Sequence, residues 1–166
     1  MDTEQVLKSG EALLQPWIKE TTQPEGHRIN VLVDSKDLLP AVKALVDNRW
    51  GYLSTITAMD MPAYKEVDGV KTAVEDGSQI ELLYHFSEGA AVLSIKVLVS
   101  YQHPVVDSIC GLIPSASLYE REVMEMLGVD ITNTPDRSKL LLPDQWPDGV
   151  YPLRKSFTGL KREEKA

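Results

Sequence analysis

Residues 79–100, QIELLYHFSEGAAVLSIKVLVS, contain two runs of strand-forming residues separated by a short link that includes a glycine. In the second run, residues 91–100, every other side chain is apolar, while the positions between them are mixed. A strand with one apolar face is typical of a sheet that packs against helices on one side only. The link at residues 87–90 has the length of a hairpin connection. This stretch therefore predicts a β-hairpin with one buried face.

The neighbouring segments extend this hairpin into a domain. Residues 29–34 alternate and residues 52–59 are rich in β-branched side chains, so both predict strands. Residues 38–48 repeat apolar side chains at helical spacing behind Asp37, a plausible N-cap. Residues 62–78 are polar and predict either a surface loop or a protruding hairpin.

A second helix is predicted from about residue 117 to Gly128. Ser117-Leu-Tyr-Glu120 has the Ser-x-x-Glu form of a capping box, and Gly128 stands where a helix end favours a left-handed residue. Arg121 and Glu125, four residues apart on the polar side, can form an ion pair. The element order β-α-β-β-β-α predicts the α+β class, with a mostly antiparallel sheet packed on helices.

One carboxylate on this helix conflicts with its surroundings. On a helical wheel Glu122 falls inside the apolar arc, and Glu120 falls on its border. A carboxylate on a buried face is costly unless it is paired or hydrogen-bonded. Three interpretations of Glu122 stay open: an ion pair with Arg137 or Arg154, a contact to another subunit, or a proton relay.

The chain is predicted to have three parts. Residues 1–28 form a helical arm followed by a loop, residues 29–128 form the α+β domain, and residues 129–166 form an extended tail with four prolines. Within that tail, residues 140–155 combine apolar side chains with tryptophan and arginine, the residue types enriched at interface hot spots. Docking on a partner and wrapping around its own domain are both open for this tail.

Composition excludes several classes of protein. The 166 residues include 17 basic and 25 acidic side chains, a net charge of −8, which would repel a nucleic-acid backbone. The single cysteine, Cys110, excludes an intramolecular disulfide framework and a cysteine-based metal site. No signal-peptide pattern is present, and no run approaches the ~18 apolar residues of a membrane span. We therefore expect a soluble, cytoplasmic protein.

No familiar catalytic motif is recognisable. The sequence lacks a glycine-rich phosphate loop, a nucleophile elbow and the HExxH zinc motif. His27, His85 and His103 lie in separate segments, so structural roles are favoured for all three, and Cys110 is interpreted as a buried small side chain. We expect no catalytic, cofactor-binding or metal site. A stand-alone acid/base enzyme that uses Glu122 is the remote alternative.

Two segments resemble a known family. Residues 120–128, EREVMEMLG, followed by Pro135-Asp136, resemble a pattern of the "30 kDa" subunit of respiratory complex I, which is the C subunit of the bacterial enzyme. Residues 140–146 and 151–155 are also similar to that family. The wording of residues 146–155 is closer to the corresponding subunit of membrane-bound, energy-converting NiFe hydrogenases.

The resemblance implies a non-catalytic subunit that docks on a hydrogenase-like large subunit in the peripheral arm, beside iron–sulfur subunits, on the cytoplasmic side of the membrane. A NiFe centre, iron–sulfur clusters or quinone would belong to partner chains, and the C subunit of an NADH:quinone oxidoreductase is the alternative. Thr134 and Ser138 replace a histidine and an arginine of many members, so no role of that histidine is carried over. The predicted partner contacts are Arg121, Glu122, Asp136, Trp146, Pro152, Leu153, Arg154 and Lys155.

Overall fold

The structure, a computed structural model, describes residues 2–160; the last predicted tail residues, 161–166, lie outside this range. A five-stranded sheet has the order β1-β2-β5-β4-β3. Its strands are β1 (Glu20–Glu25), β2 (Arg28–Val33), β3 (Tyr52–Val67), β4 (Val70–Glu88) and β5 (Ala91–Ser100). The helices are α1 (Thr3–Leu14), α2 (Leu38–Asp47) and α3 (Ala116–Leu127), with short 3-10 turns η1 (Gln15–Trp17) and η2 (Ser35–Asp37). A small parallel ribbon joins β6 (Val105–Asp107) to β7 (Asp130–Thr132).

The sheet is antiparallel except where β2 and β5 run parallel. The predicted α+β class and the order of elements from β2 to α3 are confirmed, with β6 added before α3. The predicted loop at residues 21–28 is wrong, because residues 20–25 pair with β2. All six side chains of β1 are exposed, so the segment has no apolar alternation to reveal it.

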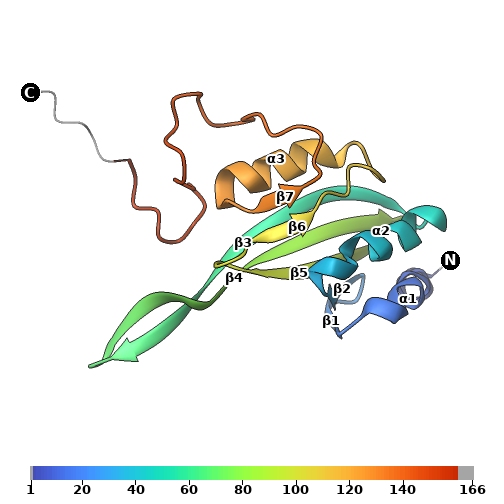
Figure 1. Cartoon of the computed structure of the whole chain (residues 1–166). Helices are drawn as coiled ribbons and strands as arrows, with labels where there is room; N and C mark the ends of the chain where they lie inside the picture. The colour runs from blue at the N-terminus through green and yellow to red at the C-terminus, as the bar shows by residue number, and fades with distance from the viewer. Residues whose placement is uncertain (1, 161–166) are drawn as a thin grey trace, which may run out of the picture.

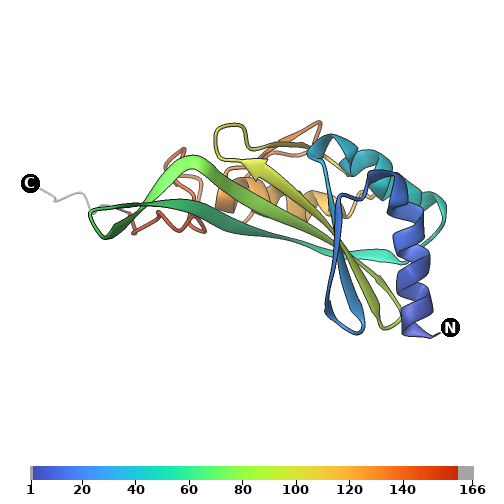
Figure 2. The same ribbon diagram turned by 90° about the horizontal axis from the view of Figure 1, so that it is seen from below.

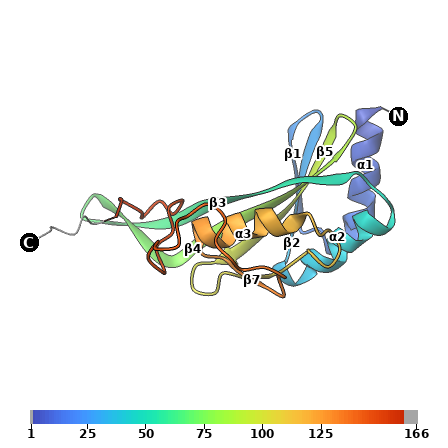
Figure 3. The same ribbon diagram turned by 90° about the horizontal axis from the view of Figure 1, so that it is seen from above.

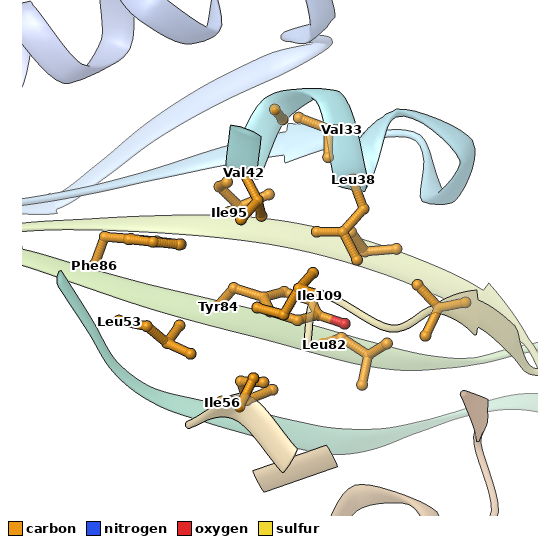
Figure 4. Close-up of a cluster of buried hydrophobic side chains, with 14 of the residues drawn as sticks. Val33, Leu38, Val42, Leu53, Ile56, Leu82, Tyr84, Phe86, Ile95 and Ile109 are labelled. Atoms are coloured by element: carbon orange, nitrogen blue, oxygen red, sulfur yellow. The ribbon is translucent and has the colours of Figure 1, made fainter. Parts of the chain in front are cut away.

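One face of the sheet carries the hydrophobic core. The alternating apolar side chains of β5 point into it, as predicted, and α2 packs over them. Figure 4 shows Val42 of α2 beside Ile95, with Tyr84 and Ile109 further along the same layer. The helix α3 lies behind the strands in the view from below and in front of them in the view from above (Figures 2 and 3). The helices therefore cover one face of the sheet.

The first helix belongs to this core. Leu7 and Leu14 of α1 are buried, and the indole N–H of Trp50 donates to the Val6 carbonyl at 3.2 Å. A Cβ at Gly10 would lie 2.6 Å from the Trp50 ring, so this glycine lets the helix approach the tryptophan closely. None of the helices within residues 2–160 is both long and apolar enough to cross a membrane.

Of the two alternatives for residues 62–78, the protruding hairpin is the one observed. β3 and β4 stay paired as far as Val67 and Val70 and project from the body at the end away from α1 (Figure 1). Asp68 and Gly69 connect the strands with φ of 51° and 77°. Positive φ at both central residues is the geometry of a type I′ turn, which Asp-Gly favours.

Candidate docking surface

The start of α3 differs from the predicted capping box. The helix begins at Ala116 behind Ser115, and no side chain caps its N-terminus. Ser117 is therefore inside the first turn and is not the cap. Glu120 does not reach back to the helix start, because it points into the core and is fully buried. The capping role assigned to Ser117 and Glu120 is wrong.

Glu120 instead joins α3 to the loop that follows β6. Its carboxylate accepts hydrogen bonds from the Ser108 hydroxyl at 2.7 Å and from the Ile109 N–H at 2.8 Å. The Cys110 thiol donates to the same carboxylate at 3.2 Å. Three donors surround a carboxylate that no cation approaches closely among the described residues. Glu120 thus holds the loop that supports the inner side of α3.

The neighbours of Glu120 stay protonated. Burial raises the pKa of the Cys110 thiol, and the adjacent carboxylate raises it further. Burial also raises the pKa of the Tyr84 hydroxyl, with the charge of Glu120 adding to the effect. A thiol with a raised pKa is a poor nucleophile, which agrees with the interpretation of Cys110 as a buried small side chain.

Glu122 lies on the opposite side of the helix from the one predicted. The buried positions of α3 are Ala116, Glu120, Val123 and Leu127, whereas Leu118 is 55% exposed. The wheel took Leu118 as part of the core and so rotated the apolar arc over Glu122. Glu122 is exposed, and it forms no ion pair with any side chain among residues 2–160.

The outer side of α3 binds the tail. The Glu125 carboxylate accepts the backbone N–H groups of Leu140, Leu141 and Leu142 at 3.2, 2.9 and 2.7 Å. Three consecutive N–H groups on one carboxylate take the place of secondary structure in this segment. The tail therefore wraps its own domain, beside α3 (Figures 1 and 3).

Arg121 makes a second set of contacts to the tail. Its guanidinium donates to the carbonyls of Ser138 and Lys139, both at 2.9 Å, and lies 3.2 Å from the Asp136 carboxylate. The predicted pair of Arg121 with Glu125 is replaced by these contacts. A groove of about 490 Å³ runs between α3 and the tail. Arg121 and Asp136, both predicted as partner contacts, are thus used within the chain.

The end of α3 is covered by the segment around Tyr151. Gly128 ends the helix with φ of 70°, as predicted, and a Cβ there would lie 2.3 Å from the Tyr151 ring. Leu153 donates its N–H to the Met126 carbonyl at 3.1 Å, and Arg154 Nε donates to the Leu127 carbonyl at 2.6 Å. These donors satisfy carbonyls that a helix end leaves free.

Trp146 also makes its contacts within the tail. Its indole N–H donates to the Val150 carbonyl at 2.8 Å, and its ring packs against Phe157 with centroids 6.0 Å apart. Lys139 Nζ donates to the Trp146 carbonyl at 2.9 Å. Trp146 and Phe157 thus form a small local cluster that shapes the tail.

Several apolar side chains on this part of the molecule stay exposed. Leu141 and Leu153, whose backbones are hydrogen-bonded to α3, are 60% and 55% exposed. Leu118 of α3 is exposed as well, one turn before Glu122. Sequence reasoning missed Leu118 and Leu141, although the run of three leucines at residues 140–142 is unusual for a free coil. We call Leu118, Glu122, Leu141, Leu153 and Lys155 the α3–tail surface.

The histidines have structural surroundings. His85 lies between the Thr57 and Ser94 hydroxyls, each 2.8 Å from one of its ring nitrogens. Within residues 2–160, no three histidine, cysteine or carboxylate side chains come together as a metal site requires. His85 therefore belongs to the hydrogen bonding across three strands.

The protonation of His85 should make stability depend on pH. Burial lowers the pKa of His85 from its usual 6.5, and the charge of Arg28 lowers it further. Its contribution is therefore complete above about pH 6.5 and is lost as the pH falls through the folded-state pKa. We expect the free energy of unfolding to fall less between about pH 7 and pH 5 in His85→Gln than in the wild type. Urea unfolding at a series of pH values measures this, and parallel curves would contradict it.

Comparison with known proteins places these features in a family. Residues 31–163 match the family described as "Respiratory-chain NADH dehydrogenase, 30 Kd subunit". The C subunit of NADH-quinone oxidoreductase from Moorella thermoacetica is 32% identical over 148 residues, which cover 87% of this chain and 90% of that protein. Membrane-bound hydrogenase subunit beta of Pyrococcus furiosus is 37% identical over 86 residues, which cover 52% of this chain and 49% of that protein.

A solved structure shares the fold. It is described as that of the membrane-bound sulfane sulfur reductase, an archaeal respiratory membrane complex. One of its chains aligns with a TM-score of 0.65 and 19% identity, over 93% of this chain and 86% of the other. The resemblance drawn from residues 120–128 and from the tail motif is confirmed. The chain belongs to the family of the 30 kDa subunit of respiratory-chain NADH dehydrogenase.

Proposed function

We propose that this chain is a non-catalytic subunit in the peripheral arm of a membrane-bound oxidoreductase complex. The α3–tail surface would dock on the hydrogenase-like large subunit. The observation that carries the proposal is the exposure of Leu118, Leu141 and Leu153 on a helix and on segments fixed to it. Exposed apolar side chains on an ordered surface are typical of protein interfaces. Relatives named as subunits of NADH-quinone oxidoreductase and of membrane-bound hydrogenase support it.

The physical contribution of such a subunit is rigidity. The contacts of Arg121 and Glu125 order the tail before any partner arrives, which lowers the entropy cost of docking. The docked subunit would hold the large subunit and the iron–sulfur subunits in one arrangement, on the cytoplasmic side of the membrane. A NiFe centre, iron–sulfur clusters or quinone would belong to those partners, and electron transfer would be coupled to ion translocation there.

We favour a complex of the energy-converting hydrogenase type, with an NADH:quinone oxidoreductase as the alternative. The hydrogenase subunit of Pyrococcus furiosus supports the first, and the Moorella thermoacetica relative supports the second. Isolation of the tagged chain from its own host separates the two. A large subunit with the four cysteines that bind NiFe would support the hydrogenase type, and one without them would support the alternative.

Two charges placed on the α3–tail surface should abolish docking. We expect the double variant Leu141→Asp, Leu153→Asp to fold normally, because both side chains are mostly exposed. Desolvating two unpaired carboxylates at an interface costs several kcal/mol, so at least about 100-fold weaker binding is expected. Co-purification with the tagged variant, followed by a native gel, measures how much complex is retained.

The control is Val46→Asp, which places the same charge on the exposed side of α2. This variant should co-purify with the complex as the wild type does. Normal assembly of the Leu141→Asp, Leu153→Asp variant would refute docking through the α3–tail surface.

A further inference from the structure

Asp60 is a buried carboxylate that belongs to none of the motifs in the sequence. It lies on β3 where the hairpin leaves the body, and it is 5% exposed. A buried carboxylate is costly unless donors surround it, so its partners show what it holds in place. These partners come from two segments that are distant in the sequence, one following β5 and one near the end of the tail.

Both oxygens of Asp60 are used. The Tyr101 hydroxyl donates to one of them, and the Lys155 N–H donates to the other at 2.7 Å. Arg154 Nη1 lies 3.7 Å from the oxygen that Tyr101 contacts. The carboxylate thus accepts a backbone donor from the tail and also offers its charge to the preceding side chain.

Arg154 connects this contact to α3. Its guanidinium lies over the Tyr101 ring, 4.2 Å from the ring centroid, while its Nε donates to the Leu127 carbonyl. The side chain is largely buried, and burial lowers its pKa from the usual value. Arg154, predicted from sequence as a partner contact, is therefore an internal bridge between the hairpin base and the end of α3.

Apolar packing contributes little to this attachment. A groove of about 410 Å³ lies between the hairpin and the tail end, with Tyr64 and Val74 on one side and Tyr151 and Ser156 on the other. Asp60, Tyr101 and Arg154 also line this groove. The polar contacts of Asp60 therefore bridge two segments that are otherwise separated by the groove.

We propose that Asp60 is the positioning residue of the docking tail. Its carboxylate fixes residues 154–155, and this holds Leu153 and Lys155 of the α3–tail surface in one arrangement before the large subunit binds. The inference rests on the proposed function and adds to it a residue outside the docking surface. The tail is bound at two points: Glu125 holds residues 140–142, and Asp60 holds its end.

The variant Asp60→Asn tests this with little change in shape. Asparagine has a single acceptor oxygen and no charge, so it cannot serve both Tyr101 and the Lys155 N–H while attracting Arg154. Trypsin cleaves after Arg154 and Lys155, and it requires the chain to leave the domain surface. We expect cleavage at these two bonds to be at least about 10-fold faster in the isolated variant, as followed by mass spectrometry.

The matched control is Asp76→Asn, an exposed carboxylate on the same hairpin. It should leave the cleavage rate unchanged. Tyr101→Phe removes only the hydroxyl donor, and it should speed cleavage by a smaller factor. It also keeps the test valid if Asp60→Asn folds poorly. An unchanged rate at residues 154–155 in both Asp60→Asn and Tyr101→Phe would overturn the proposal.

Binding to the complex separates this inference from the proposed function. We expect Asp60→Asn to bind about 10-fold more weakly while its thermal unfolding stays close to that of Asp76→Asn. If cleavage is faster but binding is unchanged, the tail end is held by Asp60 but its order is not needed for docking, and the positioning role is refuted. If the Leu141→Asp, Leu153→Asp variant binds normally, the proposed docking surface fails instead.

Discussion

Replacing Glu120 with alanine is expected to lower the free energy of unfolding by about 3–5 kcal/mol. The substitution leaves the Ser108 hydroxyl, the Ile109 N–H and the Cys110 thiol without their acceptor in a buried site. Each unsatisfied buried donor costs about 1–3 kcal/mol, and the cavity left by the side chain adds to this loss. Urea denaturation followed by circular dichroism measures the change.

Two variants on the same helix make the result specific. Glu120→Gln keeps the shape and one acceptor oxygen, so about half of the loss is expected. Glu122→Ala removes an exposed carboxylate and should change the free energy of unfolding by less than about 0.5 kcal/mol. Equal effects at Glu120 and Glu122 would show that the inner side of α3 has been assigned wrongly.

Replacing Gly128 with alanine is expected to cost about 2–4 kcal/mol and to release the Tyr151 segment. The left-handed conformation at φ of 70° disfavours any side chain by about 1–2 kcal/mol. The new methyl group would also overlap the Tyr151 ring, where its nearest atom lies only 2.3 Å away. The ring must move, so we expect trypsin to cleave after Arg154 and Lys155 faster than in the wild type.

Gly149→Ala separates the two causes of this effect. Gly149 has φ of 73°, but no atom lies within 4 Å of the position that its Cβ would take. It should therefore show only the backbone cost of about 1–2 kcal/mol. If the losses at Gly128 and Gly149 were equal, close packing of Tyr151 on the helix end would be disproved.

The central sheet could be predicted from the sequence because its strands alternate. The apolar side chains of β5 appear at every second position, and those of the inner part of β4 do as well, so both strands are visible without knowledge of their partners. β1 could not be found in this way, since all its side chains are exposed and backbone pairing with β2 alone defines it. β6 and β7 have three residues each, too few for a period to appear.

The docking helix shows a limit of the helical wheel. The arc was centred on the assumption that an apolar residue such as Leu118 is buried, and it therefore placed Glu122 inside and Glu120 at the border. Leu118 is one of the exposed side chains, and the buried carboxylate is the one that finds donors on a loop outside the helix. No local pattern contains those donors, because the turn of the chain after β6 brings them there.

The tail shows the same limit in its contacts. Residue types alone indicated that Trp146 and Arg154 take part in recognition of some kind, but they could not distinguish a partner from the chain's own domain. The Leu127 carbonyl that accepts from Arg154 lies 27 positions away, and Asp60 lies 95 positions from Lys155. Such long-range pairs are set by tertiary structure, and a single sequence does not reveal them.

The strand order has a consequence for how the chain is made. β5 lies between β2 and β4, so the sheet remains in two parts until residues 91–100 have left the ribosome. Until then the emerging polypeptide carries β2 with one edge unpaired and Ile29 and Val31 uncovered. Unpaired apolar edges promote association between chains. Synthesis of this protein thus includes an interval in which nascent chains are prone to associate with one another, and that interval ends when β5 enters the gap.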